Sequence, residues 1–134
     1  MGIRKRNKAN ILKAQKKKLA IAKLRNCPIS PRKMRSVADL LRGKEVGKAL
    51  NILKFNPRHA SKFLEKLLLS AISNWQSKNK DQSIESTNII INEIKVDGGR
   101  ILKRLRPAPQ GRAHRIRKRS NHVTVVLESN NEIK

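Results

Sequence analysis

A stretch of twenty residues, Arg100–Arg119, carries nine Lys or Arg side chains and no acidic residue. The segments on either side of it, residues 89–96 and 122–127, are rich in Ile and Val and predict two β-strands. A chain that leaves a sheet, crosses this cationic stretch and returns to the same sheet forms a long hairpin arm. The arm holds too few apolar residues and too many like charges to fold by itself in water. We therefore expect a surrounding polyanion, in particular nucleic acid, to order it.

Charge is distributed unevenly along the 134 residues, whose formal net charge is +24. Residues 1–25 carry ten basic residues and no acid, whereas residues 26–99 carry thirteen basic and seven acidic residues. This pattern is typical of proteins that bind a phosphate backbone. We expect a basic N-terminal extension at residues 1–20 and a single globular domain at residues 21–134, which includes the arm at about 97–121.

Catalytic and redox chemistry finds little support. A single cysteine, Cys27, excludes an internal disulfide and a zinc site, and indicates a reducing compartment. The three histidines, His59, His114 and His122, have no carboxylate at a suggestive spacing. No apolar run is long enough for a membrane span or a signal peptide, so we expect a soluble, cytoplasmic protein. We predict no enzyme, no metal, no cofactor and no membrane partner.

Hydrophobic periodicity predicts three helices. The first spans residues 30–43, the second spans residues 44–53, and the third begins at residues 56–57. Ser30 is the expected capping residue of the first helix, and Gly43 is its expected stop signal. The third helix presents an apolar stripe of nearly five turns, which we expect to be the core of the domain. The stripe consists of Ala60, Phe63, Leu64, Leu67, Leu68, Ala71, Ile72 and Trp75.

Residues 22–27 predict an edge strand, residues 77–88 predict a polar surface connection, and Gly98-Gly99 is interpreted as a turn signal. The predicted fold class is α+β: three helices packed on a small three-stranded antiparallel sheet, with a long basic β-hairpin extension and a basic N-terminal tail. For the tail, residues 1–20, composition favours disorder in the free protein. A helix or an extended strand laid along phosphates in a complex stays open as the alternative.

The arm is expected to turn near residues 106–111, where Pro107 and Pro109 interrupt the strand ladder and Gly111 tolerates unusual backbone angles. With about ten residues a side at about 3.3 Å each, the arm would reach on the order of 30 Å. Residues 102–105 do not divide into one apolar and one polar face. Such a mixture is expected of an arm that RNA encloses on several sides.

The mode of binding follows from the scarcity of aromatic residues. Phe55, Phe63 and Trp75 are too few for a surface built on base stacking, so we expect Arg and Lys to contact phosphates of a folded RNA. Arg32 and Lys33 lie at the start of a helix, where the helix dipole disfavours cations unless an anion compensates. This favours contact of both residues with RNA, and the alternative is that they form a merely solvated helix face. The candidate RNA-binding residues are the cations of the edge strand, first helix and arm, with one histidine: Lys23, Arg25, Arg32, Lys33, Arg35, Arg100, Lys103, Arg104, Arg106, Arg112, Arg115, Arg117, Lys118, Arg119 and His122.

Several separated motifs in order resemble one family, that of large-subunit ribosomal protein twenty-two, bacterial type. The resemblance runs from about Ala22 to Glu128 and is most specific in the second strand of the arm. The motifs that carry it are Ser30–Arg35 with Val37–Gly43, Ala49–Leu53, Ser70–Asn74, and Gly111–Ile116 followed by Lys118–Val126.

The resemblance implies a domain on the surface of the large subunit beside the nascent-chain exit, with a hairpin that threads inward through large-subunit ribosomal RNA. The hairpin tip then forms part of the tunnel wall. The implied partners are that RNA, neighbouring large-subunit proteins and the nascent polypeptide, with early binding in assembly and no homo-oligomer. The tunnel-lining residues would be Leu102, Lys103, Arg104, Arg106, Pro107, Ala108, Pro109, Gln110, Gly111, Arg112 and Ala113.

Two features depart from the family pattern. Residues 1–20 precede the usual bacterial start, so the resemblance implies no contacts for them. At the tip, Gln110 stands where a basic residue is common, and Pro109 adds stiffness beside Pro107.

Three other function classes compete. An architectural DNA-binding dimer also pairs a helical body with a basic β-arm, and Pro107 and Pro109 could wedge between base steps, but the apolar stripe leaves no evident dimer face. A basic membrane-binding helix suits residues 1–20 alone. An RNA-processing enzyme lacks the acidic or metal cluster that its chemistry needs.

Removing Leu102-Lys103-Arg104 should leave the thermal stability of the isolated protein nearly unchanged, because these residues are predicted to lie in the arm, outside the apolar core of the domain. The measurement is the melting temperature followed by circular dichroism. A large loss of stability would mean that the arm folds onto the domain.

Overall fold

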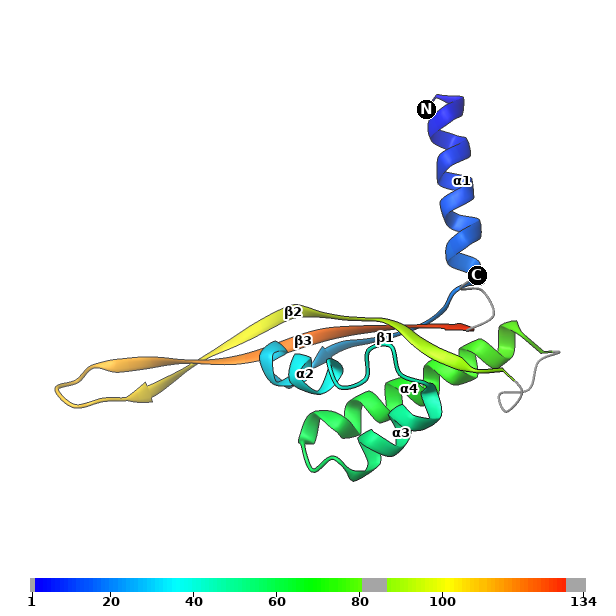
Figure 1. Ribbon diagram of the computed structural model, residues 1–134. Coiled ribbons are helices and arrows are strands. Elements are labelled where there is room, and N and C mark those ends of the chain that lie inside the picture. Colours follow the sequence, from blue (N-terminus) through cyan, green and yellow to red (C-terminus); the bar gives the residue numbers. More distant parts are fainter. Residues whose placement is uncertain (1, 81–86, 130–134) are drawn as a thin grey trace.

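The computed structural model describes residues 2–80 and 87–129, with side chains described throughout these ranges except at residues 15–18. In chain order the elements are α1 (Ile3–Lys18), β1 (Ala20–Cys27), α2 (Pro31–Ala38), α3 (Val46–Phe55), α4 (His59–Lys78), β2 (Ile89–Pro107) and β3 (Ala113–Ser129). The strands form one antiparallel sheet in the order β1-β3-β2. β2 and β3 continue far beyond the rest of the sheet as a narrow hairpin (Figure 1).

The predicted α+β class is confirmed, with α2 and α4 against the sheet and α3 packed on α4. Seven of the eight residues of the predicted apolar stripe are buried, and the eighth, Phe63, is half-buried at the edge of the core. Alternation along β3 buries Val123, Val125 and Leu127 while Thr124 stays partly exposed. Burial of each large apolar side chain stabilises the domain by about 1.5–3 kcal/mol, and all of these buried side chains lie outside the arm, residues 97–121.

The start of α2 is confirmed, but its end was predicted wrongly. The helix begins at Pro31, although the Ser30 side chain makes no capping hydrogen bond, and it ends at Ala38 rather than near Gly43. Gly43 has a left-handed φ of 68°, and its N–H donates to the Ile91 carbonyl at 3.0 Å. Its conformation therefore turns the chain alongside β2, a long-range requirement that local helix signals do not reveal.

The interpretation of Gly98-Gly99 as a turn is wrong. Both residues lie inside the continuous strand β2, at a bulge between Gly98 and Ile101. A Cβ atom at Gly99 would lie 2.6 Å from Ser120 Oγ and 3.1 Å from the Ser120 carbonyl carbon. Ser120 Oγ in turn donates to the Arg100 carbonyl at 2.6 Å. The two strands approach closely here, at the place where the arm leaves the domain.

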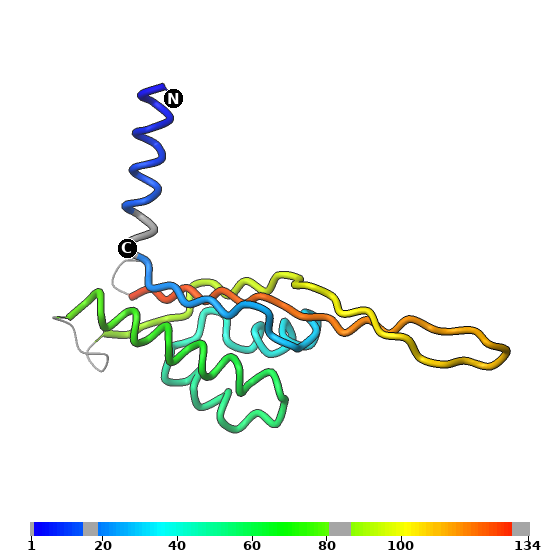
Figure 2. Tube along the Cα trace, turned by 180° about the vertical axis from the view of Figure 1, so that it is seen from behind, coloured from blue at the N-terminus to red at the C-terminus, as the bar shows by residue number. Residues whose placement is uncertain are grey.

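For the tail, the structure shows the helical alternative, because residues 3–18 form the helix α1. α1 stands apart from the sheet and the other helices in both views (Figures 1 and 2). None of the helices in residues 2–80 and 87–129 is long and apolar enough to cross a membrane. The predicted connection at residues 77–88 begins inside α4, which extends to Lys78, and its middle lies outside the described residues.

Gly99→Ala should destabilise the protein by about 1–3 kcal/mol, because the new methyl group would lie 2.6 Å from Ser120 Oγ and 3.1 Å from its carbonyl carbon, so that the Ser120 backbone would have to shift. Gly98→Ala is the matched control, since a Cβ atom there meets nothing within 4 Å. Urea unfolding of both variants measures the difference. Equal stability of the two variants would contradict the close approach at Gly99.

Candidate nucleic-acid interface

The arm, residues 97–121, makes no contribution to the buried core between Arg100 and Arg119. Every side chain in that range is exposed except those of Ala108 and Ile116, which are half-buried. Leu105 is 71% exposed and Leu102 is 52% exposed, although both are large apolar residues. The arm is therefore a two-stranded ribbon whose surface is open to a partner on all sides.

Strand register distributes cations over both faces of this ribbon. Successive residues alternate between faces, and residues directly opposite each other share a face. One face carries Ile101 opposite Arg119, Lys103 opposite Arg117 and Leu105 opposite Arg115; the other carries Leu102 opposite Lys118, Arg104 opposite Ile116 and Arg106 opposite His114. The predicted mixture of apolar and basic residues on each face is thus confirmed, and the like-charged pair Lys103–Arg117 destabilises the isolated arm.

The tip turns within the predicted segment. Ala108 N–H donates to the Arg112 carbonyl at 3.0 Å, which closes the turn. Gln110 and Gly111 both have left-handed backbone conformations, with φ of 64° and 67°. Glycine adopts this conformation at little cost, whereas Gln110 holds it against a steric penalty. The tip is accordingly a tight turn.

The body contributes exposed cations beside the base of the arm. Lys23 and Arg25 lie on β1, and Arg32 and Lys33 lie in the first turn of α2. Arg35 differs from them, because its Nε and Nη2 atoms donate to the Val96 carbonyl at 3.3 and 3.0 Å. Its guanidinium ties α2 to β2, a structural role that the sequence reasoning missed.

His122 also has a role inside the domain. Its Nδ1 atom accepts a hydrogen bond from the Asn26 backbone N–H at 3.0 Å, with Asn26 in a left-handed conformation at φ 55°. Asn26 lies where the register of β1 against β3 shifts, so His122 supports this irregularity in the edge strand. The contacts of His122 thus describe a structural role within the sheet.

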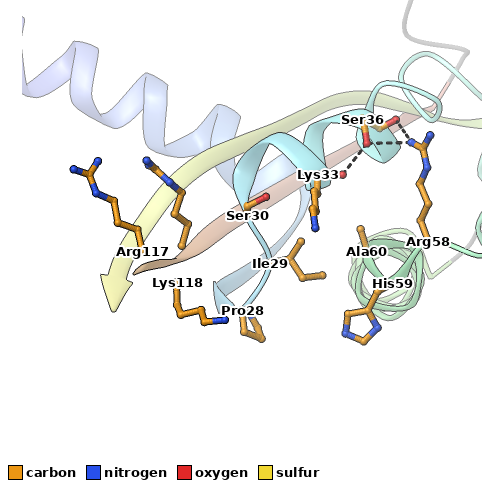
Figure 3. Close-up of a pocket in the computed structure, with 11 residues that line it drawn as sticks. Pro28, Ile29, Ser30, Lys33, Ser36, Arg58, His59, Ala60, Arg117 and Lys118 are labelled. Atoms are coloured by element: carbon orange, nitrogen blue, oxygen red, sulfur yellow. Dashed lines mark hydrogen bonds between the residues drawn. The ribbon is translucent and has the colours of Figure 1, made fainter. Parts of the chain in front are cut away.

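A groove of about 700 Å³ lies at the base of the arm, between α2, the start of α4 and β3 (Figure 3). It brings together predicted residues from separate segments, Lys33 with Arg117, Lys118 and Arg119. A second depression, of about 580 Å³, joins Arg32, Arg35 and Arg119 on the neighbouring side of α2.

Sequence reasoning did not find Arg58 and His59, which also line the groove. Arg58 Nη1 donates to Ser36 Oγ at 3.0 Å and lies 3.5 Å from the Ser36 carbonyl, so its position is fixed from α2. The signal was present: Arg58 is the N-cap residue of α4, where the helix dipole disfavours a cation, as it does at Arg32.

The remaining candidate for chemistry, Cys27, is buried at 2% exposure. Burial raises the pKa of its thiol, and a hydrogen bond from the Ile29 backbone lowers this pKa by a smaller amount. The thiol is therefore a poor nucleophile at neutral pH. Within the described ranges, no group of three or more His, Cys, Asp or Glu residues could hold a metal ion.

The architecture is a small α+β body with a cationic hairpin and a basic groove at the base of the hairpin. The model of the family described as Ribosomal protein L22p/L17e matches residues 22–128, and the chain belongs to this family. The predicted resemblance and its limits are confirmed. The proteins of this family are structural and non-enzymatic, which also confirms that this protein is not an enzyme.

Relatives match nearly the whole chain. The large ribosomal subunit protein uL22 of Christiangramia forsetii is 65% identical over 131 residues, which cover 98% of this chain and 97% of the relative. The protein of the same name from Flavobacterium johnsoniae is 64% identical over 127 residues, 95% and 93% of the two chains. The protein of the same name from Porphyromonas gingivalis is 54% identical over 131 residues, which cover 98% of this chain and 97% of the relative. Coverage of 98% takes in almost all of α1, which the family match from residue 22 leaves out.

Proposed function

We propose that this protein is a structural constituent of the large ribosomal subunit that binds ribosomal RNA through its arm, supports early subunit assembly and lines the polypeptide exit tunnel with its hairpin tip. The observation that carries the proposal is the distribution of cations over both faces of an arm without a core. RNA on several sides would neutralise both faces at once, whereas a flat anionic surface would neutralise only one. The protein would then be ribosome-bound in the cytoplasm.

The competing DNA-binding hypothesis has less support. An architectural dimer needs an apolar face for its second copy, but the α4 stripe is consumed by the core of one domain. The family to which the chain belongs also favours RNA. Phosphate contacts by the arm and by Lys23, Arg25, Arg32 and Lys33 remain the proposed mode of binding.

For the tunnel, the support comes from the shape of the tip. The tight turn at Gln110 and Gly111 keeps the end of the arm narrow, so that it fits a confined passage through RNA. The proposed tunnel-lining residues are residues 102–104 and 106–113. Gln110 would present a neutral amide to a passing nascent chain at a position where the family pattern is basic.

α1 has the electrostatics of an element that needs an anionic partner. Arg4, Lys5 and Arg6 crowd its first turn, which contains no acid and has no side-chain cap. Cations at this end oppose the helix dipole. At about 100° per residue, Ile3, Ile11 and Leu12 spread over about half of the helix circumference among eight Lys and Arg residues, so α1 has no continuous apolar face for a membrane. We propose that α1 lies along RNA phosphates, where neutralisation stabilises the helix.

The variant Lys103→Glu should change the stability of the free arm and its binding to RNA in opposite directions. The new carboxylate would face Arg117, and the opposite-charge pair should stabilise the free arm by about 0.2–1 kcal/mol, seen as slower amide hydrogen exchange. The same change should weaken binding to RNA. In sucrose gradients of cell lysates, the wild-type protein should co-sediment with large subunits at low and high salt, and the variant should be released at lower salt.

The control for this experiment is Lys62→Glu, which makes the same charge change at an exposed position of α4. It should co-sediment like the wild-type protein. If Lys103→Glu and Lys62→Glu behave alike, or if the wild-type protein leaves the subunit at moderate salt, RNA does not enclose the arm and the proposal fails.

Deleting residues 3–18 tests the proposal for α1. This segment carries eight of the 33 Lys and Arg residues and, among the residues that the structure describes, makes no extensive contact with another helix or strand, so the melting temperature should stay within a few degrees of wild type. The dependence of log K on log salt, measured with large-subunit ribosomal RNA, should become shallower by about 0.7–0.9 for each phosphate that α1 neutralises in the wild-type complex. An unchanged salt dependence would show that α1 does not bind the RNA.

A further inference from the structure

We infer that the groove at the base of the arm holds one unpaired nucleotide extruded from the RNA, with its base on an apolar floor and its phosphate among the cations of the rim. This inference rests on the proposed RNA-binding function and adds a specific contact to it. Phosphate contacts alone fix a register on RNA without reading it, whereas a bound base selects an RNA that has an unpaired nucleotide at that place.

The floor of the groove is apolar and comes from two elements. Pro28 and Ile29 precede α2, and Ala60 lies in the first turn of α4. In Figure 3 the Ile29 side chain lies between Lys33 on one side and Ala60 and His59 on the other. A phosphate gains nothing from such a floor, whereas the π-face of a base covers apolar surface and excludes water from it.

The groove is held in shape by the protein itself. Asn121 is fully buried, and its Nδ2 atom donates to the Ile29 carbonyl at 2.6 Å. The Ile29 N–H donates to the Cys27 carbonyl at 2.8 Å. Two hydrogen bonds thus fix the backbone of the floor before any RNA arrives, as in preformed ligand sites, and the volume of about 700 Å³ lies within the usual range of such sites.

The rim is cationic and partly fixed. The described residues that line the groove include Lys33, Arg58, Arg117, Lys118 and Arg119 but no carboxylate. Ser36 holds Arg58 from the side of α2.

The His59 ring, beside the floor, packs edge-on against Phe63 with 5.3 Å between ring centroids. This contact limits the freedom of the imidazole, which is the one aromatic ring among the described residues that line the groove and could stack on a base.

Chemical probing of large subunits that contain the double variant Arg58→Ala, His59→Ala as their only copy of this protein tests the inference. Dimethyl sulfate and a carbodiimide together report on the Watson–Crick faces of all four bases. One nucleotide, shielded in wild-type subunits, should become about tenfold more reactive at its base, because the variant removes a stacking partner and a cation. Lys62→Ala, an exposed position of α4 outside the groove, should leave the pattern unchanged. Changes confined to the RNA backbone would overturn the inference.

A second measurement leaves the groove cations in place and covers the case in which the double variant does not assemble. A photo-crosslinking amino acid at position 59 should attach to one unpaired nucleotide of the large-subunit ribosomal RNA. Attachment to paired nucleotides, to protein or to nothing would overturn the inference. The same probe at position 102 reports on the arm: a missing RNA crosslink there would contradict the proposed function itself, whatever position 59 reaches.

Discussion

Repulsion between like charges in an arm that has no core is the constraint on which the rest of the structure depends. Lys103 faces Arg117 directly across the strands, and no carboxylate lies between Arg100 and Arg119 to relieve them. The body must therefore build its core without the arm, and relief of the repulsion within the arm must come from outside it. The buried α4 stripe meets the first requirement, because it supplies a core that ends where the arm begins. The cations on both faces make the second requirement possible to meet, because an anionic partner that encloses the arm would neutralise the charge on both faces.

An arm ordered from outside still has to leave the body at a defined place. Four consecutive residues of β3, residues 119–122, provide this, because each reaches a different neighbouring structure. Arg119 lines the groove, and Ser120 donates a hydrogen bond to the Arg100 carbonyl in the bulge of β2. Asn121 donates a hydrogen bond to the Ile29 carbonyl in the groove floor. His122 accepts a hydrogen bond from the Asn26 N–H in β1. The base of the arm, the edge strand and the groove are thus positioned together by one short segment.

The sequence predicted those features that depend on neighbouring residues. The α4 stripe, the strands and the turn near Gly111 follow from local periodicity and turn chemistry, and the structure confirms them. The errors and omissions concern residues whose partners are distant in the chain. Gly43 and Gly99 were interpreted by local rules, but their roles are set by Ile91 and Ser120. Arg35 and Arg58 likewise bind backbone or side-chain groups of other elements, 61 and 22 residues away. Such pairs exist only once the fold has formed, so composition and periodicity do not encode them.

The separation of the binding elements has a consequence for affinity. α1 and the arm leave one body as separate projections, and the groove lies at the arm's base. If both projections bind RNA as proposed, each is held mainly by charge, and the binding of each alone would weaken as salt rises. Joined through one domain, they would act as one multivalent ligand, because the release of one element would leave the others bound and keep it at a high effective concentration near its site. This linkage would add to the resistance to salt that enclosure of the arm provides, and the contacts within the folded body, Asn121 to Ile29 and Ser120 to Arg100, would support RNA binding by holding the arm and the groove in place.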